Sequence, residues 1–233
     1  MSKKKLVVLS GAGISAESGL QTFRGAGGLW EGHRVEDVAT PEAWQRQPSL
    51  VLEFYNQRRS QLQNASPNEA HYLLKDLENW FDVHIITQNV DDLHERAGSR
   101  KVLHLHGLLT QVRSERNPNL ILDWGYKPLY LGDKGPDGAQ LRPHVVWFGE
   151  AVPAMEEAER ITQSADIFLI VGTSLQVYPA AGLVFMVPQK VPIWYIDPDP
   201  NADFESGFIR FIRATATEGM KIFFKEITQK FGL

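Results

Sequence analysis

The sequence predicts an α/β fold, a doubly wound, Rossmann-like parallel sheet with a small irregular insert module. Three observations lead to this fold class. Short apolar runs without polar alternation recur along the chain, as in strands that are buried on both faces. Stretches of helical periodicity lie between these runs, an order typical of parallel strands joined by crossover helices. A segment rich in glycine and proline interrupts this order and predicts the insert.

The elements follow one another along the chain in this alternating order. The expected central strands are the apolar runs at residues 6–9, 83–86, 167–171 and 193–196. The expected helices cover residues 48–63, 67–79 and 153–164. In the second helix, we expect Ser66 to cap the N-terminus and Pro67 to hold the first helical position, where its missing N–H costs nothing.

The segment rich in glycine and proline covers residues 113–141. Its turn residues are too closely spaced for another crossover unit. We therefore predict one Rossmann-like domain formed by residues 1–112 and 142–233, with residues 113–141 as a small module inserted between the two parts.

Composition excludes several classes of protein. The net charge of −4 argues against a dedicated nucleic-acid binder, which is usually basic. No apolar run approaches the roughly 20 residues of a membrane span, and the apolar run at residues 6–9 is too short for a signal peptide. The absence of cysteine excludes disulfides and thiolate metal sites. We expect a cytoplasmic protein that binds neither nucleic acid nor membrane.

The first apolar run ends in a turn, Gly11-Ala12-Gly13, and a helical stretch begins at Ile14. A strand, a glycine turn and a helix N-terminus bring backbone N–H groups and the helix dipole to one point, which suits the phosphates of a nucleotide. The same glycines can also serve only to turn the chain in a protein that binds no nucleotide. This motif alone does not decide between the two.

Polar residues also follow the other expected strands, at the sheet edge where doubly wound folds bind ligands. Gln88, Asn89, Asp91 and Asp92 follow the second strand, and capping of the next helix explains one of them rather than the whole group. The third strand ends in Gly172-Thr173-Ser174, which suits phosphate or ribose hydroxyls. Asp197 follows the fourth strand, where it can accept from a ribose or simply start a proline turn.

Two histidines, His104 and His106, stand two residues apart and face the same side if they lie in a strand. A histidine there can be a catalytic base or a structural hydrogen-bonding group. The pair is also a possible metal site, but no further histidine or carboxylate stands nearby at ligand spacing. We therefore expect no metal.

Five motifs occur in one order along the chain: GAGISAESGLQTFR, TQNVDDLHERAG, LHGLL, RPHVVWFGE and VGTSLQVYPAAG. In residues and spacing they resemble the sirtuin family of NAD-dependent protein deacylases, from about Leu6 to the C-terminus. The resemblance implies NAD as the cofactor and acyl-lysine proteins as substrates. It implies nicotinamide, free lysine and O-acyl-ADP-ribose as products. We expect the enzyme to act as a monomer.

The resemblance also implies a role for individual residues. His106 would be the catalytic base, with Asn89 and Asp91 placed to stabilise positive charge that develops on the ribose. The peptide would add as an extended strand between residues 146–150 and 175–178, against Val146, Phe148 and Gly149. The residues expected to bind the cofactor are Gly11, Ala12, Gly13, Ala16, Phe23, Arg24, Gln88, Asn89, Gly172, Thr173, Ser174, Asp197 and Ala216.

Two features depart from the family's pattern. Sirtuins usually carry four zinc-binding cysteines after the catalytic histidine, and this chain has none; Asp123, Asp133 and Asp137 are too hard and too scattered to replace thiolates. We therefore predict a module without zinc. Asp197 stands where family members more often have asparagine, and its charge near the phosphates is expected to weaken NAD binding. The module is expected to be held by the packing of Leu120, Leu122, Trp124, Tyr126, Leu129 and Tyr130.

The helix predicted at residues 48–63 carries an arginine within an apolar stripe. Val51, Tyr55, Arg58 and Leu62 recur at helical spacing and share one face. A cation there can reach solvent or pair with a structural carboxylate. The Tyr55/Arg58 pair also resembles the pair with which one sirtuin subclass accepts succinyl-, malonyl- or glutaryl-lysine, since a guanidinium matches a carboxylate. We expect desuccinylase and demalonylase activity beside deacetylase activity.

Two other functions use the same cofactor site. An ADP-ribosyltransferase or NAD hydrolase needs no channel for acyl-lysine, so the VVWFGE motif and the Tyr55/Arg58 pair favour the deacylase. A non-catalytic sensor of NAD or ADP-ribose needs no base, so the presence of both His106 and Asn89 argues against it.

Overall fold

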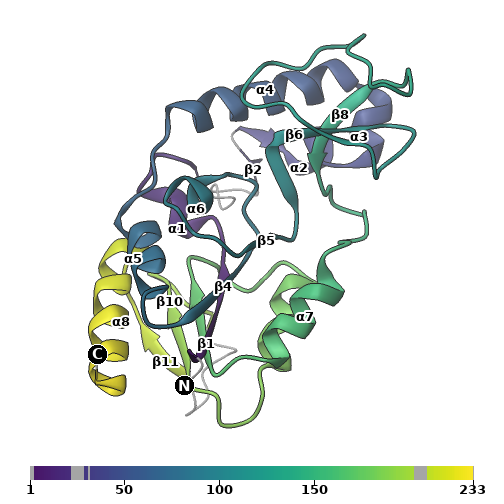
Figure 1. Ribbon diagram of the computed structural model, residues 1–233. Helices are drawn as coiled ribbons and strands as arrows, with labels where there is room; N and C mark the ends of the chain where they lie inside the picture. Colours follow the sequence, from purple (N-terminus) through teal and green to yellow (C-terminus); the bar gives the residue numbers. More distant parts are fainter. Residues whose placement is uncertain (1–2, 22–28, 31, 202–208, 233) are drawn as a thin grey trace.

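The computed structural model describes the chain apart from residues 1–2, 22–28, 31, 202–208 and 233 (Figure 1). Its centre is a six-stranded sheet in the order β11-β10-β9-β1-β4-β5, and all neighbouring strands in it run parallel. Because the first strand lies between the fourth and the ninth, the chain winds outwards from β1 in both directions, as predicted. The strands are β1 (Lys5–Ser10), β4 (Asp82–Thr87), β5 (Val102–His104), β9 (Ile167–Val171), β10 (Ile193–Ile196) and β11 (Ile209–Ile212).

The four strands predicted from apolar runs hold the four central positions of this sheet. The two strands that were not predicted, β5 and β11, are its two edges. Their side chains are mostly half-buried or exposed, so neither strand has a continuous apolar run. The sequence signal is therefore strongest where both faces of the sheet are covered.

Helices cover both faces of the sheet (Figure 1). Leu6 and Val8 of β1 face α5 (Glu69–Leu77) and α8 (Ala216–Phe231). Val7 and Leu9 face α7 (Met155–Gln163) and the 3-10 helix η1 (Ala180–Met186). The short helices α1 (Gly13–Ala16) and α6 (Leu93–Arg96) have one turn each. Among the described residues, no helix combines the length and the apolar character needed to span a bilayer.

The predicted start of α5 is wrong by two residues. The helix begins at Glu69, and Asn68 rather than Ser66 caps it. The Asn68 side chain accepts from the Ala70 N–H at 3.0 Å, and the backbone N–H of Asn68 donates to His71 Nδ1 at 3.3 Å. Asparagine caps as well as serine does, and this reciprocal bonding favours the later start.

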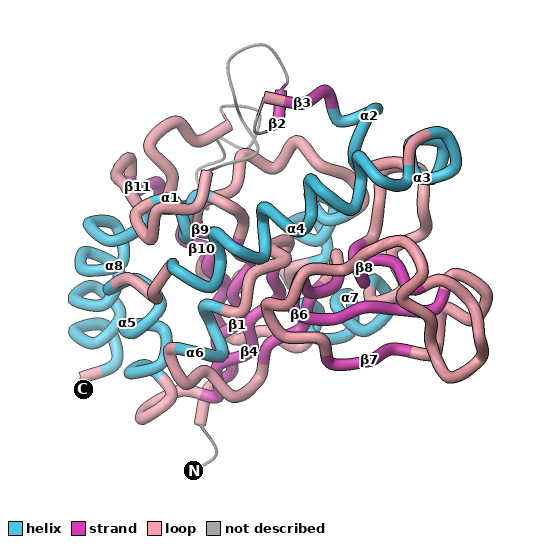
Figure 2. The backbone as a smooth tube through the Cα atoms, turned by 90° about the horizontal axis from the view of Figure 1, so that it is seen from above, coloured by secondary structure: helices cyan, strands magenta, loops and turns pink. Residues whose placement is uncertain are grey.

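A second lobe lies beyond the carboxyl edge of the main sheet (Figures 1 and 2). It contains a three-stranded antiparallel sheet in the order β7-β6-β8, which the sequence did not predict. One hydrophobic cluster joins this sheet to the helices of the lobe, so they form a common core. The elements are α2 (Val35–Val38), α3 (Pro41–Arg46), α4 (Pro48–Asn64), β6 (Gly107–Ser114), β7 (Ile121–Asp123) and β8 (Leu141–Val145), with the short pair β2 (Leu29–Trp30) and β3 (His33–Arg34) nearby.

The segment between β6 and β8 packs on α4 through part of the predicted set of side chains. Leu129 is fully buried, and Leu122, Trp124 and Tyr126 pack against the lobe's core. The expectation for Tyr130 is wrong, because 61% of it is exposed. Among the described residues, no group of three histidine, aspartate or glutamate side chains is placed to hold a metal ion.

Helix α4 holds this segment through a polar anchor formed by Asn56 and Arg59. The Asn56 amide donates to the Leu129 carbonyl at 2.9 Å and accepts from the Leu129 N–H at 2.8 Å. Arg59 Nη1 donates to Asn56 Oδ1 at 2.9 Å, and Arg59 Nε donates to the Leu109 carbonyl at 2.8 Å. Burial lowers the pKa of Arg59 to about 10, so it stays charged at neutral pH. This anchor fastens the insert and β6 to one helix.

Replacing Asn56 should therefore destabilise the protein. Asn56→Ala leaves the N–H and the carbonyl of buried Leu129 without these partners, at a cost of about 1–3 kcal/mol for each group. We expect the free energy of unfolding in urea to fall by about 2–4 kcal/mol. The matched control is Gln57→Ala, an exposed position on the same helix. A loss no larger than the control's would show that the anchor contributes nothing.

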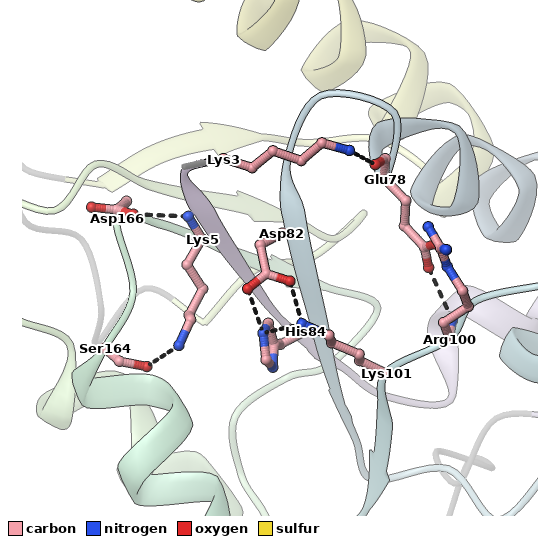
Figure 3. Close-up of polar contacts among 9 residues, drawn as sticks. All are labelled: Lys3, Lys5, Glu78, Asp82, His84, Arg100, Lys101, Ser164 and Asp166. Atoms are coloured by element: carbon pink, nitrogen blue, oxygen red, sulfur yellow. Dashed lines mark hydrogen bonds and ion pairs between the residues drawn. The ribbon is translucent and has the colours of Figure 1, made fainter. Parts of the chain in front are cut away.

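The charged residues at the amino end of the main sheet pair with one another (Figure 3). The Lys5 N–H donates to Asp166 at 2.8 Å, which ties β1 to the start of β9. His84 and Lys101 both contact the Asp82 carboxylate, which ties β4 to the start of β5. This network is structural, and the polar residues at the opposite, carboxyl edge form the candidate site.

Candidate active site

A cavity of about 550 Å³ lies between the carboxyl edge of the main sheet and the second lobe. It brings together every site residue expected from the sequence except Phe23 and Arg24, which lie outside the described residues. The expected residues that line it are Gly11, Ala12, Gly13, Ala16, Tyr55, Arg58, Gln88, Asn89, Asp91, His106, Val146, Phe148, Gly149, Gly172, Thr173, Ser174, Asp197 and Ala216.

The glycines at the floor of the cavity hold two loops in backbone contact. The Gly13 N–H donates to the Gly172 carbonyl at 2.8 Å, so the loop after β1 touches the loop after β9. A Cβ on Gly13 would lie 2.7 Å from Gly172 Cα, and one on Gly172 would lie 2.3 Å from the nitrogen of Ile14. Packing between the loops thus explains these glycines. Because α1 has one turn only, its dipole adds little, and the small side chains of Ala12 and Ala16 leave room for an extended ligand such as a dinucleotide.

Ser15 joins the two polar residues that follow β4. Its hydroxyl donates to Asp91 Oδ2 at 2.9 Å and accepts from the Asn89 amide at 3.1 Å. Asp91 Oδ1 also accepts from the N–H of Leu93, the first residue of α6, at 3.1 Å. Burial raises the pKa of Asp91, although the bonds from Leu93 and Ser15 oppose that shift. Ser15 is not among the site residues expected from the sequence, although its place two residues after the glycine turn is a signal that could have identified it.

The two histidines contact the same loop but differ in environment. His106 Nδ1 bonds to the Gln88 carbonyl at 2.9 Å, and His104 Nδ1 bonds to the Asn89 carbonyl at 3.0 Å. Burial lowers the pKa of His106, with the Gln88 bond opposing the shift. Burial also acts to lower the pKa of His104, but the Glu95 carboxylate, 2.7 Å from Nε2, raises it overall. His106 is therefore neutral at pH 7, while His104 is held by an acidic partner.

Because a carbonyl oxygen only accepts hydrogen bonds, the Nδ1 of His106 must carry the proton. In the neutral ring, the lone pair then lies on Nε2. The ring also lines the cavity, so His106 has both the tautomer and the position that a general base needs.

The other end of the cavity lies near the start of α8. Glu17 accepts hydrogen bonds from the Thr217 N–H at 2.9 Å and from the hydroxyls of Thr215 and Thr217. These bonds fix the start of α8 beside α1 and place buried Ala216 at the cavity wall. Asp197 Oδ1 accepts from the Asp199 N–H at 3.0 Å, so it does start the proline turn. Sequence reasoning missed Glu17, because its partners are about 200 residues away.

Helix α4 forms the wall opposite the main sheet. Tyr55 is fully buried and Arg58 is 8% exposed, which excludes the alternative in which Arg58 reaches solvent. Arg58 Nε donates to the Gln61 side chain at 3.1 Å, and the guanidinium lies over the Phe54 ring at 4.7 Å. The Tyr55 hydroxyl accepts from Trp147 Nε1 at 3.0 Å. Sequence reasoning did not single out Trp147, although it stands between two residues of the predicted peptide site.

Comparison with known proteins agrees with this geometry. Residues 11–179 match the model of the Sir2 family. The chain is 54% identical over 230 residues to an NAD-dependent protein deacylase of Bacteroides thetaiotaomicron, covering 94% of this chain and 95% of that protein. It is 58% identical over 218 residues to an NAD-dependent protein deacylase of Helicobacter pylori, again covering 94% and 95%.

Solved structures match over nearly the whole chain. A complex of a Sir2 homologue with NAD superposes with a TM-score of 0.87 at 40% identity, covering 98% of this chain and 91% of that one. A complex of Sir2 with a p53 peptide and NAD⁺ superposes with a TM-score of 0.76 at 26% identity, covering 99% and 94%.

Proposed function

The chain belongs to the Sir2 family and is an NAD-dependent protein deacylase, and from this premise we propose that it removes succinyl and malonyl groups from lysine as well as acetyl groups. The observation that carries the acyl part is that Tyr55 and Arg58 line the same cavity as His106 and the glycine loops. The guanidinium of a nearly buried arginine can form a bidentate ion pair with a carboxylate at the end of an acyl chain.

NAD is the cofactor, and when bound it supplies an activated ribose carbon whose bond to nicotinamide can break. The turns Gly11-Ala12-Gly13 and Gly172-Thr173-Ser174 would hold its phosphates, and Asp197 and Ala216 its adenosine end. Asn89 and buried Asp91 would face the ribose, where a fixed dipole and a carboxylate stabilise developing positive charge. The proposed products are nicotinamide, free lysine and O-acyl-ADP-ribose.

His106 is the proposed general base. The Gln88 carbonyl fixes the tautomer that leaves a lone pair on Nε2, and burial keeps the ring neutral. Nε2 of His106 would take a proton from a ribose hydroxyl of the bound cofactor.

The rate should depend on pH through this residue. The protonated ring has no lone pair, so we expect kcat/KM to fall as pH decreases through the pKa of His106, with a midpoint below the usual 6.5. The measurement is kcat/KM for an acetyl-lysine peptide between about pH 5 and pH 8, with circular dichroism to show that the fold persists. A midpoint above 6.5 would contradict the assignment.

We also propose that the peptide binds in extended form between residues 146–150 and 175–178. The backbone on one side is fixed, since the Val146 N–H donates to the His106 carbonyl and the Phe148 N–H donates to the Ala39 carbonyl. Residues of both segments line the cavity. Main-chain pairing would give affinity for many sequences. In this proposal the enzyme acts on proteins in the cytoplasm as a monomer, with residues 113–141 as a module without zinc.

The test is NAD consumption with matched acetyl- and succinyl-lysine peptides, with the deacylated peptide measured by mass spectrometry. Turnover of both peptides is expected. Turnover of the acetyl peptide alone would overturn the acyl proposal. NAD consumption without either peptide would indicate a hydrolase, and ADP-ribose on the protein or peptide a transferase.

A further inference from the structure

The buried side chain of Trp147 makes a directed contact with the wall of the acyl pocket. Trp147 is 2% exposed, and its indole nitrogen lies 3.0 Å from the Tyr55 hydroxyl. An indole N–H can only donate, so the Tyr55 oxygen is the acceptor in this bond. The hydrogen of the Tyr55 hydroxyl therefore points away from Trp147.

The indole is held by two side-chain contacts and through its backbone. The Arg142 guanidinium lies 3.3 Å from the centroid of one ring, and the Trp44 ring packs beside it at 5.8 Å. Glu150 accepts from the Trp147 N–H at 2.8 Å and pairs with Arg142 at 2.7 Å. With these contacts the indole N–H has one direction, toward Tyr55.

We propose that Trp147 is a positioning residue that determines acyl specificity, because it fixes Tyr55 as a hydrogen-bond donor to the carboxylate of a dicarboxylic acyl group beside Arg58. A hydroxyl that accepts one hydrogen bond is also a stronger donor. An acetyl group has no carboxylate to receive this bond, so the contribution belongs to the acidic acyl chains alone. The inference rests on the proposed desuccinylase function.

The burial of Tyr55 is consistent with its role as a hydrogen-bond donor. It raises the pKa of Tyr55 far above its usual range, with the Trp147 bond opposing the shift, so the hydroxyl keeps its proton at physiological pH. A hydroxyl that stays protonated in the cavity that Arg58 also lines can donate without adding a second negative charge to the pocket.

Trp147→Phe removes the N–H and keeps an aromatic ring. We expect the ratio of succinyl to acetyl kcat/KM to fall about five- to tenfold, mainly through KM for the succinyl peptide. Tyr55→Phe should lower the ratio as well, and the double variant should equal Tyr55→Phe alone, because the two residues act through one hydrogen bond. Trp194→Phe is the matched control, since this buried indole lies in β10, away from the cavity lining, and donates to Glu226 instead.

Replacing Trp147 with 3-benzothienylalanine, in which sulfur takes the place of the N–H, removes the donor at nearly constant shape and serves if the phenylalanine variant unfolds. An equal fall for both acyl groups, or a further fall in the Tyr55→Phe background, would overturn the positioning role. Absence of succinyl turnover in the unchanged enzyme would instead overturn the proposed function, and the inference with it.

Discussion

His106→Ala should lower kcat/KM for acetyl- and succinyl-lysine peptides alike by about 10²- to 10⁴-fold, the usual contribution of a general base. The loss should be equal for the two because the base acts on the ribose and not on the acyl chain. The measurement is release of deacylated peptide under single-turnover conditions, with NAD binding followed separately by calorimetry.

The matched control for this variant is His84→Ala. His84 lies in β4 at the opposite end of the same sheet, where it pairs with Asp82 (Figure 3). A loss confined to His106→Ala identifies the base. Retention of more than about a tenth of the activity by His106→Ala would show that another group removes the proton.

Arg58→Met should produce the second large effect, a fall of about 10²-fold in the ratio of succinyl to acetyl kcat/KM. Methionine keeps the length and the apolar stem of the side chain and removes only the charge that would pair with the acyl carboxylate. Loss of one partner of a buried charge pair typically costs about 2–5 kcal/mol. Steady-state kinetics with the two matched peptides measures the ratio.

Arg46→Met is the control for this change, because Arg46 is an exposed arginine in the adjacent helix α3, paired with Asp37. It should leave the ratio as it is. An equal fall in both efficiencies for Arg58→Met would mean that Arg58 supports the packing of α4 and does not recognise the acyl group.

The sequence predicted the centre of the fold better than its periphery. The apolar runs of β1, β9 and β10 are unbroken and that of β4 is interrupted by His84 alone, because helices cover both faces of these central strands, whereas β5 and β11 have one neighbouring strand each. The small sheet β7-β6-β8 was missed because its order depends on contacts with α4, which lies far away in the sequence.

Some residues of the candidate site could likewise be predicted from the sequence and others could not. The catalytic and cofactor-binding residues expected within the five motifs were named from local sequence, and those that the structure describes line one cavity, whereas Asp92 contacts Tyr126 and Arg96 instead. Ser15, Glu17 and Trp147 were missed, since each acts through a partner on a distant element: Asp91, Thr217 and Tyr55, respectively. Spacing along a chain carries no information about such pairs.

The anchor on α4 bears on the conditions under which the enzyme can work. Asn56 and Arg59 hold the insert with an amide and a guanidinium, and the chain contains no thiol. Peroxide and chelators, which attack thiolate-bound metal, have no target in such an anchor. The same helix carries Tyr55 and Arg58, so the support of the insert and the proposed recognition of the acyl group rest on adjacent residues. Peroxide and chelators should therefore leave this anchor intact, whereas heat that loosens α4 should change the proposed acyl selectivity and the stability together.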